Sequence, residues 1–497
     1  MRPAFVILYV CSKNKKEANL MSNKIISQLT RKFEAELSKA FESLDFTNLV
    51  NNLDGFKTKV LGASLGYVSG ILNAMDIEIA NSEARRKNGF LVQKRDVERT
   101  ITTPLGDLTY KRSYYKEKTT GQHCYLLDQI IGVESYERIS KETIAMVIEN
   151  ACEMSYAKAV KVAEMDFSRQ TVNNRIHALG EIVPKFEGEK ITAGHFELFV
   201  DEDHVPVRDG NGKTSSKIVP VAVVATGVDK SNSKRHTLEN PLYLAEFPVS
   251  PDAFFNDLYA MMQLKYYYPA TASITVHADG GQWIKHVEDV LPNTEFALDG
   301  FHLSKYKKAI KKYADKGTGQ AIDNALKSGD LEKFKELCKR VKGTLESQEK
   351  EMFEENSNYF VNNWKAIQKR LSGAAVGSCT EAMVSHLTAE RVSRTPGAWT
   401  QEGLSNMTML RTLMANGEHV EPSNIRVHRD KDAEKERIDL RKRQGYNIYR
   451  ELIEKERASI AKELKEIYRE DRGTYWYDVA SGTQILKKIL SRVPTTT

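Results

Sequence analysis

Two segments of this chain combine residue types and positions that suit metal chemistry. Residues 196–201 (FELFVD) and 273–279 (SITVHAD) are short, largely apolar runs, and they end in Asp201 and Asp279. Runs of this kind are typical of buried strands. Because an α/β sheet binds its ligands at the carboxyl ends of its strands, the two aspartates are candidate metal ligands.

The segments around these aspartates alternate between strand and helix patterns. Strands are predicted at 196–200, 218–226, 242–247, 274–276 and 296–298, with helices at 251–267 and 282–290 after the third and fourth strands. The first three strands follow one another directly and are expected to be antiparallel neighbours. This β-β-β-α-β-α-β order is that of the RNase H-like fold. Its first and fourth strands are adjacent, which would bring Asp201 next to Asp279.

Two neighbouring carboxylates repel each other unless a cation neutralises them, and their hard oxygen atoms favour Mg²⁺ or Mn²⁺. Two such ions about 4 Å apart can stabilise both the attacking and the leaving oxygen of an in-line phosphoryl displacement. A third carboxylate is then expected further along the chain.

Glu381 is the candidate for that third carboxylate. Residues 304–371 are rich in Lys and Glu, with apolar residues at helical spacing, and are predicted to form a helical insertion. After the insertion, the small residues of 373–379 lead into a helix with Glu381 in its first turn. Glu390 and Glu402 compete for this role, but they lie deeper in that helix or beyond the next proline.

Each proposed ligand has an alternative interpretation. Asp203 shares a strand face with Asp201 and could be the ligand instead. Asp279 could form a turn with the two glycines that follow it. Glu381 could simply favour the electrostatics of a helix N-terminus.

The helical stretch from residue 140 to residue 180 has the order of a helix-turn-helix element. Ser140, Ser155 and Ser168 are suited to cap three successive helices. The third helix carries polar side chains of the types that contact bases and phosphates: Arg169, Gln170, Asn173, Asn174 and Arg175. DNA recognition is predicted for it, with a purely structural helical bundle as the alternative. A β-hairpin with basic residues on one side is predicted just before it, between residues 89 and 118.

A multidomain α+β protein of three or four domains is expected from 497 residues with 41% hydrophobic content. One long amphipathic helix is predicted from Ser22 to about Leu53. The predicted regions are an N-terminal helical region (1–88), a β-hairpin element (89–135), a helix-turn-helix-like region (136–190), the first part of an RNase H-like core (191–303), the helical insertion (304–371), the final core helix with its Glu (372–420) and a charged helical tail (421–497).

The composition limits the class of protein. Lys plus Arg number 73 against 67 for Asp plus Glu, and this net charge of +6 is compatible with a nucleic-acid partner. Five scattered cysteines without a CxxC pair argue against a zinc finger or a disulfide framework. No segment is predicted to reach the roughly 20 apolar residues that a transmembrane helix needs. An intracellular protein with no membrane part is expected.

Five blocks of sequence, in order, resemble the ISLre-type insertion-sequence transposases, which are bacterial DDE enzymes with an RNase H-like core. The blocks are TPLGD from Thr103, VDEDHV from Val200, HADGGQWI from His277, LDGFHLSKY from Leu298, and EAMVSH from Glu381 with RVSRTPGAW close behind it. The resemblance covers residues 91 to 414.

This resemblance implies a transposase that cuts element ends and joins them to target DNA. Asp201, Asp279 and Glu381 would hold two Mg²⁺ or Mn²⁺ ions. Double-stranded DNA would be the partner. Because two ends must be held together, a homodimer or a larger synaptic assembly is expected, in the bacterial cytoplasm and associated with the nucleoid.

The resemblance also implies a role for Asp299 and His302, since related transposases place a Cys or Asp, two residues and a His after the fifth strand. The alternative is a helix-capping aspartate and a histidine bonded to the sheet edge. Residues 392–396 (VSRTP) depart from the Ser-Ser-Arg-Pro expected there. Phosphate contacts are expected from seven basic residues: Lys305, Lys307, Lys308, Lys311, Lys312, Arg391 and Arg394.

Two other classes of protein stay open. An RNase H-like nuclease would use the same metal ions and cut DNA without joining strands. A transposase-derived protein that is catalytically silent would bind DNA and do no chemistry.

Overall fold

A computed structural model describes residues 15–51, 53–180, 182, 184–231, 237–267, 272–291, 293–373, 380–394 and 397–426. The predicted charged tail from residue 427 onward and the small-residue approach to Glu381 lie outside these ranges. The described chain is a mixed α/β protein with several sheets. It divides into two compact units. The first contains the described residues up to Gly180 and those from Val420 to Arg426, and the second contains the described residues between Gly180 and Val420.

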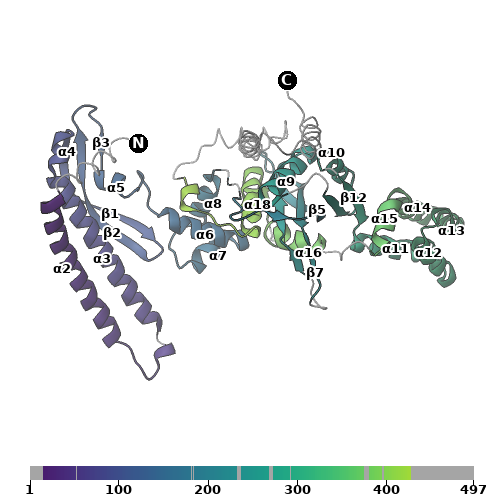
Figure 1. Cartoon of the computed structure of the whole chain (residues 1–497), viewed down its shortest axis with the longest axis horizontal. Helices are drawn as coiled ribbons and strands as arrows, with labels where there is room; N and C mark the ends of the chain where they lie inside the picture. The colour runs from purple at the N-terminus through teal and green to yellow at the C-terminus, as the bar shows by residue number, and fades with distance from the viewer. Residues whose placement is uncertain are drawn as a thin grey trace, which may run out of the picture. The chain divides into compact units, whose positions relative to one another are not determined.

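The first unit begins with a helical hairpin of α2 (Lys15–Glu42) and α3 (Leu53–Asn81), which run side by side (Figure 1). A short 3₁₀ helix, η1 (Leu49–Asn51), lies between them. The prediction of one helix to residue 53 was wrong, because the carboxylate of Asp45 accepts hydrogen bonds from the backbone N–H and the hydroxyl of Thr47. An aspartate that bonds to backbone two residues ahead makes a turn.

Helix α3 corrects a second expectation. Among the described residues it is the one helix whose length and composition would allow it to cross a membrane. Glycine, alanine and serine are interspersed along it, so it contains no unbroken apolar run. Helix α3 contacts α2 and strand β2. Gly70 of α3 faces Leu29 of α2, where a Cβ would lie 2.5 Å from the leucine side chain.

The predicted β-hairpin is present in the first unit. Strands β1 (Phe90–Thr103) and β2 (Gly106–Glu117) pair in antiparallel fashion, and β3 (His123–Cys124) extends the sheet. Short helices α4 (Glu83–Lys87) and α5 (Leu126–Ile130) flank it. The sheet packs on α3 through a core that includes Leu72, Ile79, Tyr110 and Tyr115.

Three short helices follow the sheet, and all three start where the sequence predicts. They are α6 (Lys141–Glu153), α7 (Tyr156–Val162) and α8 (Arg169–His177). The side chains of Ser140, Ser155 and Ser168 each accept a hydrogen bond from the backbone N–H three residues ahead. Serine caps of this kind satisfy N–H groups that have no partner inside a helix.

The second unit is built on a six-stranded sheet with the order β12-β11-β5-β6-β9, and β13 (Trp399–Thr400) pairs with β5. Its strands are β5 (His195–Arg208), β6 (Thr214–Ala225), β9 (Leu242–Ala245), β11 (Ser273–Ala278) and β12 (Thr294–Leu298). Strand β6 is antiparallel to both β5 and β9, whereas β11 is parallel to both β5 and β12. The first and fourth predicted strands, β5 and β11, are therefore neighbours, as the strand order predicts.

Smaller elements complete this part of the chain. One pair of short strands is parallel, β4 (Ile191–Thr192) with β10 (Tyr266–Tyr267), and another is antiparallel, β7 (Gly227–Asp229) with β8 (Thr237–Glu239). The helices are α9 (Pro251–Lys265), the 3₁₀ helix η2 (Gln282–His286) and α10 (Val287–Val290). Helix α9 packs on one face of the sheet, where Phe254, Phe255 and Leu258 join Leu198 and Val200 in the core.

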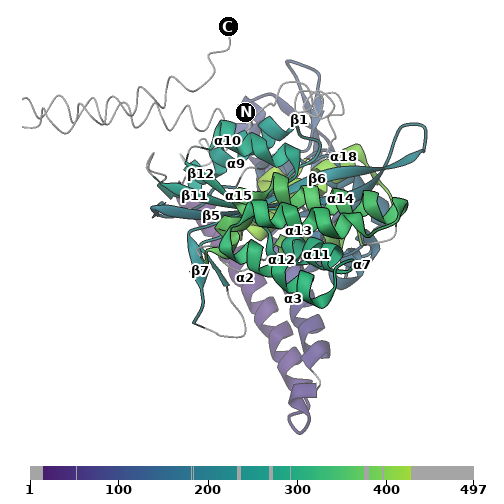
Figure 2. The ribbon, with the colours of Figure 1, turned by 90° about the vertical axis from the view of Figure 1, so that its right-hand side faces the viewer.

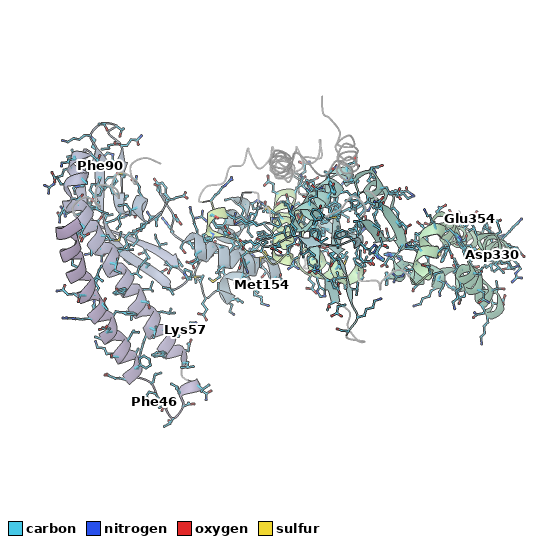
Figure 3. All side chains as sticks on the ribbon, in the orientation of Figure 1. Phe46, Lys57, Phe90, Met154, Asp330 and Glu354 are labelled. Carbon is cyan, nitrogen blue, oxygen red and sulfur yellow. The ribbon has the colours of Figure 1, made fainter. Side chains whose placement is uncertain are left out.

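The stretch after β12 is helical and has a hydrophobic core of its own. It contains α11 (Gly300–Lys311), α12 (Lys316–Ser328), α13 (Leu331–Gly343), α14 (Ser347–Asn362) and α15 (Trp364–Leu371), which gather into one cluster (Figure 2). Phe334, Phe353 and Phe360 lie at the centre of this core. Asp330, the N-cap of α13, and Glu354 on α14 lie in the same cluster (Figure 3).

The chain then returns to the sheet through α16 (Thr380–Val384), the π-helical turn η3 (Ser385–Ala389) and α17 (Glu390–Val392). Helix α18 (Gln401–Ala415) covers the edge strand β9, and the 3₁₀ helix η4 (Pro422–Asn424) follows it. Thr412 and Asn416 bond the backbone of Ala245 and Tyr243. These bonds satisfy edge groups that would otherwise be open to another strand.

Candidate active site

Three aspartates occupy matching positions on three adjacent parallel strands. Phe199 of β5 pairs with His277 of β11, and His277 pairs with Ala297 of β12. Asp201, Asp279 and Asp299 each follow one of these paired residues by two positions in the sequence. Because side chains alternate with a period of two, all three belong to the face of the sheet opposite the α9 core.

The surroundings of Asp201 differ from the prediction in one respect. Asp279 and Asp299 come directly after their strands, but Asp201 lies inside β5, which continues to Arg208. The strand continues because its polar second half pairs with β6 as far as Thr214, forming a hairpin arm. Because charged residues interrupt the apolar pattern in this arm, the apolar run alone predicts a strand that ends too early.

Burial and neighbouring charge shift the pKa of Asp201. Desolvation, together with the negative charges of Asp279 and Asp299, raises the pKa of Asp201 to about 6, against the opposing effects of the Glu202 N–H and of His302. The Glu202 N–H donates to Asp201 Oδ1 at 2.9 Å. Burial is the main cause of this shift, and the two neighbouring aspartates add to it, so a bound cation would favour the ionised form of Asp201.

Asp299 is the most deeply held of the three aspartates, with 1% of its surface exposed. Its Oδ2 accepts from the backbone N–H groups of Phe301 and His302 at the start of α11, and its Oδ1 accepts from the Thr380 hydroxyl at 2.7 Å. The pKa of His302 is raised, first by its hydrogen bond with Asp299. Asp299 therefore caps α11 and anchors the start of α16, and His302 lies against it.

The helix that carries Glu381 lies on the same face as the aspartates. Met383 of α16 packs against Phe199 and Val223 of the sheet. The neighbour of Glu381, Thr380, is the residue bonded to Asp299, and the Glu381 side chain itself is exposed. Within the described part of the chain, no three His, Cys, Asp or Glu side chains are grouped closely enough to hold a metal ion.

The helix beyond Glu381 contains a π-helical turn, η3. The buried Arg411 of α18 donates to two backbone carbonyls of this turn: its Nε bonds Leu387 O at 2.8 Å, and its Nη2 bonds His386 O. Single π turns are frequent at functional sites. Arg411 thus ties the helix of Glu381 to α18.

Asp203 lies further along β5 than the aspartate cluster. It is buried, with 6% of its surface exposed, and one carboxylate oxygen has no hydrogen-bond partner among the described residues. The charges acting on Asp201 come from Asp279, Asp299 and His302. Of the two candidates on β5, Asp201 is the one placed with the other aspartates.

The helical insertion reaches the aspartate cluster. The Tyr359 hydroxyl of α14 donates to the backbone carbonyl of Asp279 at 2.5 Å, and its ring stacks on Tyr306 of α11 at a centroid distance of 3.7 Å. Gly280 has a φ of +90°, which favours glycine, and a Cβ there would lie 2.5 Å from Asn363 Oδ1, so Asn363 would have to move to admit a side chain. The insertion therefore holds the loop that carries Asp279.

The predicted DNA-contacting residues fall in both units. On α8, Arg169, Gln170 and Asn174 are exposed, whereas Asn173 and Arg175 are half-buried, and Arg175 donates to the carbonyl of Arg426. In the second unit, Lys305, Lys308 and Arg394 are exposed. Arg391 is buried with its guanidinium 4.9 Å from the centre of the Trp399 ring, so it packs inside the protein in this structure.

Three residues of the site were missed in the sequence: Thr380, Tyr359 and Arg411. Thr380 had a weak signal, since a threonine before a first-turn glutamate is placed to contact a neighbouring element. Tyr359 and Arg411 had none, because their contacts join segments that are far apart in the sequence.

These features define a class of protein: a mixed α/β protein whose parallel strands carry aligned aspartates, with a helical insertion beside them. Residues 39–428 match the uncharacterised protein family UPF0236, and the chain belongs to that family.

Similar proteins occur in Caldanaerobacter subterraneus subsp. tengcongensis, and all of them are named UPF0236 proteins. One is 34% identical over 405 residues, covering 79% of this chain and 84% of the relative. A second is 32% identical over 421 residues, covering 82% of this chain and 83% of the relative. A third is 32% identical over 406 residues, covering 79% of this chain and 84% of the relative.

Proposed function

We propose that this protein is a DDE transposase of the ISLre type, with an RNase H-like core in its second unit. The observation that carries the proposal is the alignment of Asp201, Asp279 and Asp299 on adjacent parallel strands, with the Glu381 helix packed on the same face. The sheet order supports the RNase H-like assignment. The antiparallel strands β5, β6 and β9 come first in the sequence, and the parallel strands β11 and β12 then extend the sheet from β5 on the side away from β6.

The donor chemistry at this site supports divalent metal ions, because carboxylate oxygens are the ligands that Mg²⁺ and Mn²⁺ prefer. Asp279 and Asp299 add negative charge around the buried Asp201. Asp201, Asp279 and Glu381 would hold two Mg²⁺ or Mn²⁺ ions. When bound, such ions supply an activated water and stabilise charge on the phosphodiester. For Glu381 to take part, its exposed side chain must turn toward the aspartates when metal binds.

Other residues of the chain orient this site. Asp299 fixes the first turn of α11 and the start of α16 through its hydrogen bonds. His302 places a protonatable nitrogen, Nδ1, 3.4 Å from the Asp299 carboxylate, where its charge offsets that of the aspartates. Tyr359 holds the Asp279 loop through the backbone carbonyl. Together these contacts keep the two strand ends in place while DNA is bound and cut.

The names of the relatives support a mobile element. One relative's name joins eleven gene designations of a single strain, and another joins four. A protein carried under many designations in one genome is expected of a sequence that copies itself. DNA flanking the gene for this chain should then contain inverted repeats and short target duplications.

The proposed partner is double-stranded DNA, both the element ends and the target, in the bacterial cytoplasm at the nucleoid. The exposed polar side chains of α8 would read the ends, and Lys305, Lys308 and Arg394 would contact phosphates. Strand transfer requires two ends, so a homodimer or a larger assembly is proposed.

Cleavage of end DNA tests the proposal. The purified full chain should cut DNA that carries its own flanking sequence in Mg²⁺ but not in EDTA. Asp201→Asn and Asp279→Asn should each remove cleavage while DNA binding is retained. If cleavage persists in both variants, the site lies elsewhere. A silent DNA-binding protein would bind the ends and cut in no condition.

A further inference from the structure

A phenylalanine is exposed beside the aspartate cluster. Phe301, on the first turn of α11, has 51% of its surface open to solvent and is the exposed phenylalanine among the described residues of the second unit. An exposed large apolar side chain next to a polar site is informative, because burial of such a ring is favourable. Something absent from the free protein is expected to cover it.

The backbone at Phe301 is held within the cluster. Its N–H donates to Asp299 Oδ2 at 2.8 Å, and its ring makes an edge-to-face contact with His302 at a centroid distance of 5.3 Å. The ring is thus fixed beside the aspartates, and its open surface is available to a ligand at that site.

A row of lysines continues from Phe301 along α11. Lys305, Lys308 and Lys312 follow it at steps of four, three and four residues, which places all four side chains on one side of the helix. The three lysines are exposed, and none makes an ion pair with a described residue, whereas Lys307 and Lys311 on another side pair with Asp323. The row extends about 16 Å at 1.5 Å per residue.

An exposed aromatic ring followed by cations that form no ion pair with a described residue suits a single nucleic-acid strand. Lys305 and Lys312 lie near the rings of their neighbours Tyr306 and Tyr313. Lysines alone would serve any phosphate backbone, whereas a side-chain ring adds a stacking surface that suits the open face of an unpaired base. Charge complementarity favours a polyanion over a protein partner here, since α11 carries no acidic residue.

We propose that this face of α11 binds a single-stranded segment of DNA, with Phe301 stacked on the base next to the bond that is cut. The lysines then contact successive phosphates. This inference rests on the proposed function and narrows its substrate: DNA whose end is unpaired, or is opened, at the active site.

Fluorescence of 2-aminopurine, which is quenched by stacking, tests the inference. The full chain is mixed in EDTA with a single-stranded oligonucleotide that contains this base. Quenching is expected on binding. Phe301→Ala should abolish it and weaken binding by about 5- to 150-fold, the range for loss of one stacked base. Phe301→Tyr should retain both. Phe46→Ala, at an exposed ring on the tip of the α2–α3 hairpin, is the matched control (Figure 3).

The lysines have their own readout. Lys305→Gln should reduce the slope of log affinity against log salt by about 0.7, the value for one phosphate contact on a single strand. Lys339→Gln, an exposed lysine on α13, should leave the slope unchanged.

Unchanged quenching in Phe301→Ala, or no quenching with the unaltered chain, would overturn the inference. So would an equal loss of affinity in Phe301→Ala for a fully paired duplex. Because the assay contains no metal, stacking without any cleavage in Mg²⁺ would reject the proposed function and keep this inference. Cleavage without stacking would do the reverse.

Discussion

At the scale of single residues, the aspartate cluster is held by contacts to backbone as much as by its own side chains. Asp279 follows β11 directly, and its carbonyl is the acceptor for Tyr359. Asp299 uses both oxygens to hold neighbouring helices. Asp201 and Asp279 each use one oxygen to accept a backbone N–H, from Glu202 and Gly281, and the second bond forms the turn that the Asp-Gly-Gly sequence allows. Their other oxygens are left for chemistry, while Asp299 has a positioning role.

Removal of the Tyr359 hydroxyl should affect cleavage more than folding. Tyr359→Phe keeps the stacking on Tyr306 and loses one hydrogen bond, which is worth about 1 kcal/mol. We expect DNA cleavage to slow by about fivefold, with an unchanged Kd for DNA. Tyr313→Phe, in the turn that follows α11, is the control; the Tyr313 hydroxyl contacts Met352. Equal rates for Tyr359→Phe and the unaltered chain would show that the loop needs no such support.

A buried ion pair beneath the cluster makes stability depend on pH. Glu197 lies within hydrogen-bonding distance of His277 at 2.7 Å. Burial acts to raise the pKa of Glu197, but the hydrogen bond and charge of His277, with those of His195, lower it overall. Because folding lowers the pKa of Glu197, its ionised carboxylate stabilises the folded protein at pH values above 4.5, its ordinary pKa. This stabilisation is lost as the pH falls through the lower pKa of the folded state.

Glu197→Gln should therefore lower the free energy of unfolding by about 2 kcal/mol at neutral pH, the scale of a buried hydrogen bond to a charged group. The difference from the unaltered chain should shrink below pH 4.5. Urea denaturation at neutral and acid pH measures it. A difference that grows toward acid pH would contradict the assignment.

At the scale of elements, the turn η3 depends on one side chain. Arg411→Met removes two hydrogen bonds from a buried guanidinium to the carbonyls of His386 and Leu387, so we expect the free energy of unfolding to fall by about 2 to 4 kcal/mol. Urea denaturation checks this. Arg394→Met, at an exposed arginine bonded to Ser385, should cost about 0.5 kcal/mol or less. Arg411→Met with unaltered stability would mean that η3 supports itself.

Elements with local signals could be predicted, and those fixed by distant contacts could not. The caps Ser140, Ser155 and Ser168 locate three helices because a cap acts on the next three residues. The apolar runs located β5, β6, β9, β11 and β12, and their order predicted the pairing of β5 with β11.

The misses have physical causes. The turn at Asp45 interrupts a continuous amphipathic pattern, and only its bonds to Thr47 reveal it. The second half of β5 mixes charged residues with the buried Val205 and Val207, so it is not an apolar run although it pairs with β6 and β13. The aspartate positions were therefore predictable, but the contacts of Tyr359, Thr380 and Arg411 that hold them were not.

At the scale of the whole molecule, the α2–α3 hairpin leaves most of its apolar side chains only partly buried. From Ile25 to Ile71, Ala40 is the one described residue in the buried class, and Ile26, Phe41 and Val68 are exposed. Helices in proteins owe most of their stability to packing of an apolar face. In the proposed synaptic assembly, a second copy of the chain would cover this apolar surface of the hairpin.

Val68→Glu should then reduce self-association of the full chain, since a carboxylate on an apolar helix face opposes burial. Light scattering after size exclusion should show a smaller mass for this variant. Thr58→Glu adds the same charge at an exposed polar position of α3 and should leave the mass unchanged. A monomeric unaltered chain, with or without end DNA, would contradict a role for the hairpin in assembly.

The joining of DNA strands tests the central claim most directly. The full chain is incubated in Mg²⁺ with a pre-cut end, taken from the DNA that flanks its gene, and a supercoiled plasmid. We predict end DNA covalently joined to the plasmid by the unaltered chain and no joined product from Asp279→Asn. Cleavage without joining would make the protein an RNase H-like nuclease instead. Joining by Asp279→Asn would contradict the assignment of the site.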